Sequence, residues 1–307
     1  LPIYIGPILM LALGWPLLRA IVEGSKRQNI TSIADFISAR YGKNQMLGAL
    51  VAVIAVVGIV PYISLQLKAV SFSLTTVLPA PETLPSLIHF AAADDLALIV
   101  TAAMACFAML FGTRHIDTTE HQDGLILAIA VESIVKLAAF LAVGAFVTFW
   151  LMGGIGPLYE QAAAKSGALE LFSRGFEGGR WLTMTLLAFF AILLLPRQFH
   201  VTVVENSSLG DVKRAAWIFP LYLVAINIFV VPVAIAGLVL LDPAVDADTY
   251  VLALPVATGY PMLAMVAFIG GLSAATPTGI MESIALSLMV CNNILVPVPV
   301  RHRRAGA

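Results

Sequence analysis

Residues 47–70 read LGALVAVIAVVGIVPYISLQLKAV, a run in which Lys68 is the only charged side chain. A helix needs about 20 mainly apolar residues to cross the hydrocarbon core of a bilayer. The rest of the chain has a similar composition, since 60% of its 307 residues are hydrophobic and 11% are charged. A soluble domain is about 25% charged, because its surface must be hydrated. The sequence therefore predicts a polytopic membrane protein and excludes an ordinary soluble enzyme.

Seven stretches are apolar enough to be membrane spans, or nearly so, although the third and fifth are short. They predict an all-α polytopic membrane protein with a single transmembrane domain over residues 1–307 and no attached soluble domain. The connection between the fourth and fifth spans has room for a helix around residues 158–171. We expect the spans at residues 1–21, 47–70, 96–111, 125–152, 181–195, 215–241 and 262–294.

Lys and Arg residues predict the orientation of these spans, because they are enriched in loops on the cytoplasmic side. Twelve of them lie in the connections after the first, third and fifth spans and in the tail, whereas three lie in the connection after the fourth span. This bias predicts that the start of the chain lies outside the cell and the C-terminal tail lies in the cytoplasm. We expect the protein to be in the inner (plasma) membrane.

The connection between the first two spans has the pattern of a short amphipathic helix. Thr31 or Ser32 can cap its N-terminus, and Ile33, Phe36 and Ile37 follow at the spacing of one apolar helix face. We expect this helix to lie on the cytoplasmic face of the membrane.

Motifs for catalysis are scarce, with no GxxxxGK[ST] loop, no CxxC pair and no HExxH. His115 and His121 lie near Asp117, Glu120 and Asp123, and a metal site can be drawn there, but a solvated acidic turn is the simpler interpretation. We expect no catalytic residue, no bound metal and no organic cofactor in this chain. The net charge of −1 gives no field that attracts nucleic acid.

Ionisable side chains within the spans are the most informative residues, because a charge in a bilayer is costly and usually faces a bundle interior or a water path. Glu132 and Lys136 are four residues apart in the order that favours pairing. They form either a neutralised pair that fixes helix packing or part of a solute route. Lys68 can extend towards the interface. Glu282 is protonated or paired with a distant cation, or it lies on the route.

Two stretches can interrupt their helices. The short fifth span ends in LLPRQFH at residues 194–200, where Pro196 either unwinds the helix at a transporter's central site or ends it at the membrane face. Residues 270–279 read GGLSAATPTG. Their small residues serve close helix packing, and their hydroxyls and freed carbonyls are also suitable oxygen ligands for a small cation.

Four stretches resemble the sodium:solute symporter family. Residues 29–42, NITSIADFISARYG, resemble an element that follows the family's third span. Residues 111–122 (FGTRHIDTTEHQ), 195–200 (LPRQFH) and 270–276 (GGLSAAT) resemble the subgroup fused to bacterial sensor histidine kinases. The resemblance implies the LeuT-like fold of two inverted five-helix repeats. The chain would then hold core helices two to eight, incomplete at both ends, and we expect such a fragment to be unstable alone.

The resemblance also implies site residues. In this family the eighth core helix holds sodium through an Ala and a Ser-Thr pair, which here correspond to Ala274, Pro277 and Thr278. Pro277 departs from that pattern, and Ser273 or Thr276 can supply the missing hydroxyl. Na+ is the coupling ion that the resemblance implies, although H+ stays an alternative.

Solute contacts in such folds come partly from the broken sixth core helix, which maps Gln198 and His200 to the solute path. Glu132, Lys136 and Glu282 complete the candidates for this path.

The leading hypothesis is therefore a transporter domain that moves a small polar solute, such as an amino acid, across the lipid bilayer. As the input module of a sensor histidine kinase, it would have a C-terminal kinase domain and a response regulator as partners. The alternative is a signalling receptor domain that does not transport.

Overall fold

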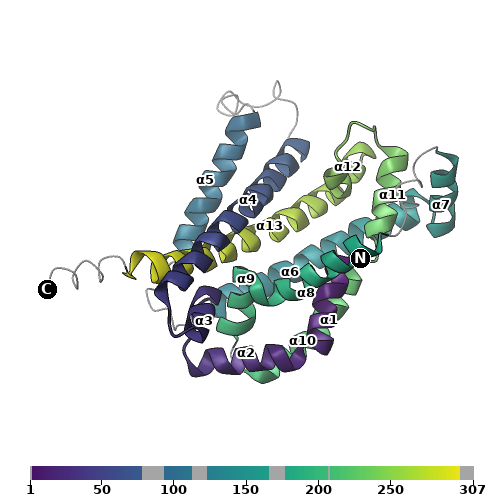
Figure 1. Ribbon diagram of the computed structural model, residues 1–307. Helices are drawn as coiled ribbons and strands as arrows, with labels where there is room; N and C mark the ends of the chain where they lie inside the picture. The colour runs from purple at the N-terminus through teal and green to yellow at the C-terminus, as the bar shows by residue number, and fades with distance from the viewer. Residues whose placement is uncertain (1, 78–92, 113–122, 166–176, 207, 298–307) are drawn as a thin grey trace.

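The computed structural model describes residues 2–77, 93–112, 123–165, 177–206 and 208–297, and every regular element within these ranges is a helix (Figure 1). This confirms the all-α prediction. The α-helices are α1 (Pro2–Leu13), α2 (Trp15–Arg27), α3 (Ile33–Arg40), α4 (Gln45–Val77), α5 (Ala93–Gly112), α6 (Asp123–Ala145), α7 (Ile155–Ala164), α8 (Gly178–Leu194), α9 (Pro196–Phe199), α10 (Leu209–Asn227), α11 (Val230–Leu240), α12 (Tyr250–Ala257) and α13 (Pro261–Val290). Three π-helical turns, η2 (Phe146–Leu151), η4 (His200–Val204) and η6 (Cys291–Leu295), continue α6, α9 and α13, and a 3-10 turn, η5 (Ala247–Thr249), precedes α12.

The described residues contain four to six candidate membrane spans, judged by helix length and composition. Four helical stretches are long and apolar enough to cross a bilayer, at Gln45–Val77, Ile126–Leu151, Leu209–Leu240 and Pro261–Leu295. Two bent pairs, α1 with α2 and α8 with α9, raise this number to six if each pair is one span. The seven expected spans are therefore not confirmed, and neither is the LeuT-like arrangement. Helix α5 covers the third expected span but is not among these stretches.

Both bends occur where the sequence interrupts a helix. Helices α1 and α2 meet at 74° around Gly14, with Pro16 in the first turn of α2. Helices α8 and α9 meet at 52° around Leu195, whose backbone is extended (φ −71°, ψ 130°). The residue before a proline is sterically disfavoured in helical conformation, so Pro196 accounts for the second bend. The predicted interruption of the fifth span is confirmed.

Helix α13 runs unbroken through residues 270–279, for which the sequence left open either close packing or an interrupted helix. Pro277 lies within α13, which extends over 30 residues from Pro261 to Val290. It packs mainly against α4 and α6 (Figure 1). Gly270 permits one of these contacts, since a Cβ atom built on it would lie 2.5 Å from the Cβ of Ala139 in α6. The interpretation of these small residues as packing residues is thus supported along part of their length.

The amphipathic helix in the first connection is confirmed as α3, with Ser32 as its N-cap: the side chain of Ser32 accepts a hydrogen bond from the Asp35 amide. The helix expected around residues 158–171 is α7, which ends at Ala164. The His115–Asp117–Glu120–His121 loop lies outside the described residues, as do most of the 111–122 motif and the basic tail after residue 297.

Candidate functional site

The centre of the candidate site is a contact between α9 and α13. Pro196 bends the chain so that Arg197 leaves the apolar run of α8 and meets α13. Its Nη1 atom donates a hydrogen bond of 3.1 Å to Oγ1 of the buried Thr278. The Thr278 hydroxyl in turn donates to the carbonyl oxygen of Ala274 at 3.0 Å. Two of the positions expected to bind sodium, Ala274 and Thr278, are therefore joined to each other and to a guanidinium group.

Glu282 lies one turn further along α13 and is only 6% exposed. One of its carboxylate oxygens, Oε2, has no hydrogen-bond partner among the described residues. The charge of Arg197 acts on this carboxylate. The two side chains are not paired, however, since no ion pair within 4 Å joins them in the described part of the chain.

Glu132 and Lys136 do not form the ion pair that their spacing allows. The Lys136 ammonium lies 6.0 Å from the ring centroid of Tyr222 in α10. The charge of Arg197 also acts on Lys136. The backbone carbonyl of Glu132 accepts a hydrogen bond of 3.3 Å from the Ser273 hydroxyl, which ties α6 to α13. The expected neutralised pair is thus replaced by an aromatic contact and a helix–helix hydrogen bond.

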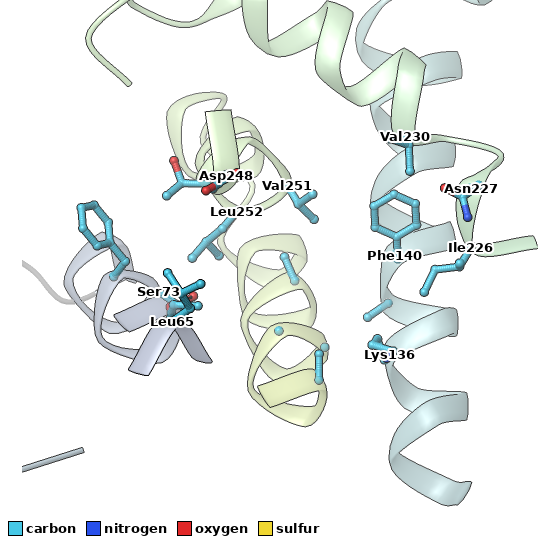
Figure 2. A pocket seen from close by; sticks show the side chains of 18 of the residues that line it. Leu65, Ser73, Lys136, Phe140, Ile226, Asn227, Val230, Asp248, Val251 and Leu252 are labelled. Carbon is cyan, nitrogen blue, oxygen red and sulfur yellow. Dashed lines mark hydrogen bonds between the residues drawn. The ribbon is translucent and has the colours of Figure 1, made fainter. Parts of the chain in front are cut away.

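A cavity of about 590 Å³ lies next to the contact between Lys136 and Tyr222, and both residues line it. It is bounded by α4, α6, α10, η5, α12 and α13, with Tyr4 of α1 and Val230 of α11 also in its lining. Figure 2 shows Leu65 and Ser73 of α4 on one side, and Lys136 and Phe140 of α6 on the other. Lys136 and Ala274 are the two predicted site residues that line this cavity, and Lys68 lines it as well.

The other predicted residues lie outside the cavity lining. His200 is in η4, where its Nε2 atom is 3.1 Å from Oε1 of Glu205, and both side chains are 6% exposed. Thr276 donates to the carbonyl of Leu272 in its own helix. Gln198 is partly buried in α9. The structure therefore joins Arg197 to Thr278, one helical turn from Glu282, whereas Lys136 lines the cavity and His200 belongs to a separate buried pair.

Arg197 lies in the LPRQFH motif at residues 195–200, but it is not among the site residues predicted from the sequence. The available signal was an arginine immediately after the proline that ends a short apolar helix, because a cation at such a break is costly unless it meets a partner. The aromatic partner Tyr222 and the cavity residue Asn227 had no comparable signal.

A second polar contact joins α3 to η6. Asn293 Nδ2 donates to Oδ1 of Asp35 at 3.1 Å, and Asn292 Nδ2 donates to Oγ1 of Thr31 at 3.3 Å. The Thr31 hydroxyl also donates to the Asp35 carboxylate. Part of the motif at residues 29–42 is therefore fixed to the C-terminal end of α13.

Comparison with known proteins gives one distant similarity. The chain is 24% identical over 287 residues to a protein of Bacillus subtilis named "Uncharacterized symporter YhjB". The match covers 92% of this chain and 54% of that protein, so the chain spans about half the length of the curated relative. No family model matches the chain, and no solved structure matches it. Together with the apolar helices, this similarity suggests a multi-pass membrane protein of a transporter family.

Proposed function

We propose that this chain is the transmembrane domain of a sodium:solute symporter-type transporter that moves a small polar solute by alternating access. The proposal depends above all on the break between α8 and α9, which brings Arg197 against Thr278 in an otherwise apolar bundle. Broken helices that present polar groups within a membrane bundle are typical of transporter sites. The distant symporter similarity supports the same assignment.

The proposed ion site uses the carbonyl of Ala274 and the hydroxyl of Thr278, with Ser273 and Thr276 as further hydroxyls. In the described conformation Thr278 is already hydrogen-bonded to Arg197. Binding of Na+ at this hydroxyl therefore requires the guanidinium to leave, because a cation and Arg197 repel each other. Such competition would couple ion binding to movement of α9. The remaining path residues are Glu132, Lys136, Glu282, Gln198 and His200.

Uptake into proteoliposomes tests this proposal. The intact protein is reconstituted, and the initial uptake of a panel of labelled amino acids is measured with an inward Na+ gradient and with the gradient replaced by choline. We expect at least a tenfold lower rate without Na+ for the transported solute. A rate that is unchanged by sodium removal contradicts sodium symport, and a parallel pH gradient then tests H+ coupling.

A second candidate is a receptor domain that senses a solute without moving it. The hydrogen bond between Arg197 and Thr278 favours it, because a hydroxyl engaged by a fixed guanidinium is not free to bind a coupling ion. In this case the domain would be the input of a sensor histidine kinase in the bacterial inner membrane, acting on a response regulator. Solute-dependent autophosphorylation of the intact protein without any uptake would support this function over transport.

A further inference from the structure

We infer that the cavity between α4, α6 and α13 binds the carboxylate group of a small organic solute, with Lys68 and Lys136 as the groups that hold it. This inference rests on the proposed function, because it names the class of solute for the same domain. It differs from the assignment of the ion site, since Ser273, Thr276 and Thr278 do not line this cavity, although Ala274 does.

The two lysines bring two positive charges to one cavity from two different helices. Lys68 comes from α4 and Lys136 from α6, and both line the same space of about 590 Å³. Within the part of the chain that the structure describes, no carboxylate lies within 4 Å of either ammonium. Each lies instead over an aromatic ring, Lys68 at 5.8 Å from the centroid of Phe72 and Lys136 at 6.0 Å from that of Tyr222. An aromatic face stabilises a cation without neutralising it.

A carboxylate paired with either lysine would weaken this preference for an anion. Glu132 is on the same helix as Lys136, but its carboxylate is not paired with that lysine. Ionisable groups within a membrane bundle usually have a partner, and here an anionic ligand would supply it.

Acidic residues occur at one edge of the cavity. Asp246 and Asp248 belong to the turn before α12, and Oδ1 of Asp246 accepts a hydrogen bond of 3.1 Å from the Asp248 amide. In Figure 2 Asp248 lies across the cavity from Lys136. A solute whose carboxylate and ammonium groups are separated by several bonds can contact both ends, whereas an α-amino acid or a simple carboxylate contacts the lysines through its carboxylate alone.

The remaining lining favours a short apolar body on the solute. Leu65, Phe140 and Ile226 line the walls, and nothing lies within 4 Å of a Cβ atom built on Gly271 of α13. The volume falls within the range of about 300–1,000 Å³ that is typical of small-molecule sites. The expected ligand is thus a small carboxylate with an aliphatic body, either an amino acid or a simple organic acid.

Equilibrium binding to the intact protein in nanodiscs tests this assignment without any need for transport. The probes are acetate, isovalerate, leucine and isovaleramide, each measured by calorimetry at pH 7. We expect isovalerate, leucine or both to bind at least tenfold more tightly than isovaleramide, which keeps the shape but lacks the charge. Leucine binding alone identifies an amino-acid site, and isovalerate binding alone identifies an organic-acid site. The assignment is overturned if no acid binds, or if the amide binds as tightly as the acids.

Variants connect this binding to the two lysines. Lys68→Met and Lys136→Met should each weaken binding of the acid at least tenfold, whereas Lys136→Arg should keep it within about threefold. Lys26→Met removes the same charge from an exposed position of α2 outside the cavity and should leave binding unchanged. Equal affinity in all variants contradicts the assignment.

The outcome is separable from that of the proposed function. Acid binding without uptake in proteoliposomes keeps the carboxylate site and argues against transport. Uptake of neutral solutes that is insensitive to Lys136→Met keeps transport and overturns the carboxylate site.

Discussion

Arg197 and Thr278 form the contact on which the candidate site depends, and the Thr278 hydroxyl is both acceptor and donor in it. A hydrogen bond to a charged donor contributes about 1.5–3 kcal/mol, and removing one partner leaves the other desolvated. We therefore expect Thr278→Val to lower the free energy of unfolding by about this amount and Thr278→Ser to restore most of it. Thermal unfolding of the purified protein in detergent measures the change.

Thr276→Val is the matched control for this experiment. Its hydroxyl donates only to the Leu272 carbonyl of its own helix, so its removal should cost less than about 1 kcal/mol. If both valine variants unfold at the same temperature as the parent, the Arg197–Thr278 contact does not contribute to stability.

At the scale of secondary-structure elements, α3 depends on contacts with η6 because it is short. A helix of eight residues is marginal by itself, and its N-cap Ser32 and the Asn293–Asp35 hydrogen bond hold it in place. Asn293→Ala should therefore increase local opening of α3. We expect trypsin to cleave severalfold faster after Arg40 and Lys43.

Limited proteolysis of the protein in detergent, with mass spectrometry of the fragments, measures this cleavage. Asn227→Ala is a suitable control. The Asn227 side chain donates to the Leu223 carbonyl oxygen in its own helix, α10, which is far from α3 in the sequence. Cleavage at an unchanged rate in the Asn293 variant would show that η6 does not hold α3.

For the whole molecule, the contact between α1 and α8 is the most extensive between any two helices, and Gly6 permits it. A Cβ atom at Gly6 would lie 2.6 Å from the Ala188 Cβ and from the Phe189 amide nitrogen. Backbone cannot yield as a flexible side chain does, so Gly6→Val should separate these helices. Overpacking of this kind costs about 1–3 kcal/mol, which thermal unfolding in detergent would detect.

Gly58→Ala provides the comparison within the same fold. Nothing lies within 4 Å of a Cβ atom built at Gly58 in the middle of α4, and alanine is a better helix former than glycine by about 1 kcal/mol. This variant should be as stable as the parent or more stable. If Gly6→Val is as stable as Gly58→Ala, then α1 does not pack closely on α8.

The helical class and one of the breaks could be predicted from the sequence because they depend on local properties. The conformation of the backbone depends on adjacent residues in three cases: apolar runs, a proline after a short span, and a serine at a helix N-terminus. For residues 270–279 the sequence left open either close packing or a break at Pro277, and α13 continues through Pro277. Packing against α4 and α6 can keep α13 helical on both sides of the proline. This packing cannot be read from the sequence.

Composition and the lengths of the apolar runs are enough to predict a set of apolar helices with a small number of charges inside them. Which groups meet those charges depends on how the helices pack. Lys136 could pair with Glu132 by spacing, but α6 presents it to Tyr222 of α10. Glu282 had no cation nearby in sequence, yet Arg197 acts on it and binds Thr278, 81 residues away. Spacing determines which groups can meet within one helix, whereas packing between helices determines which groups do meet.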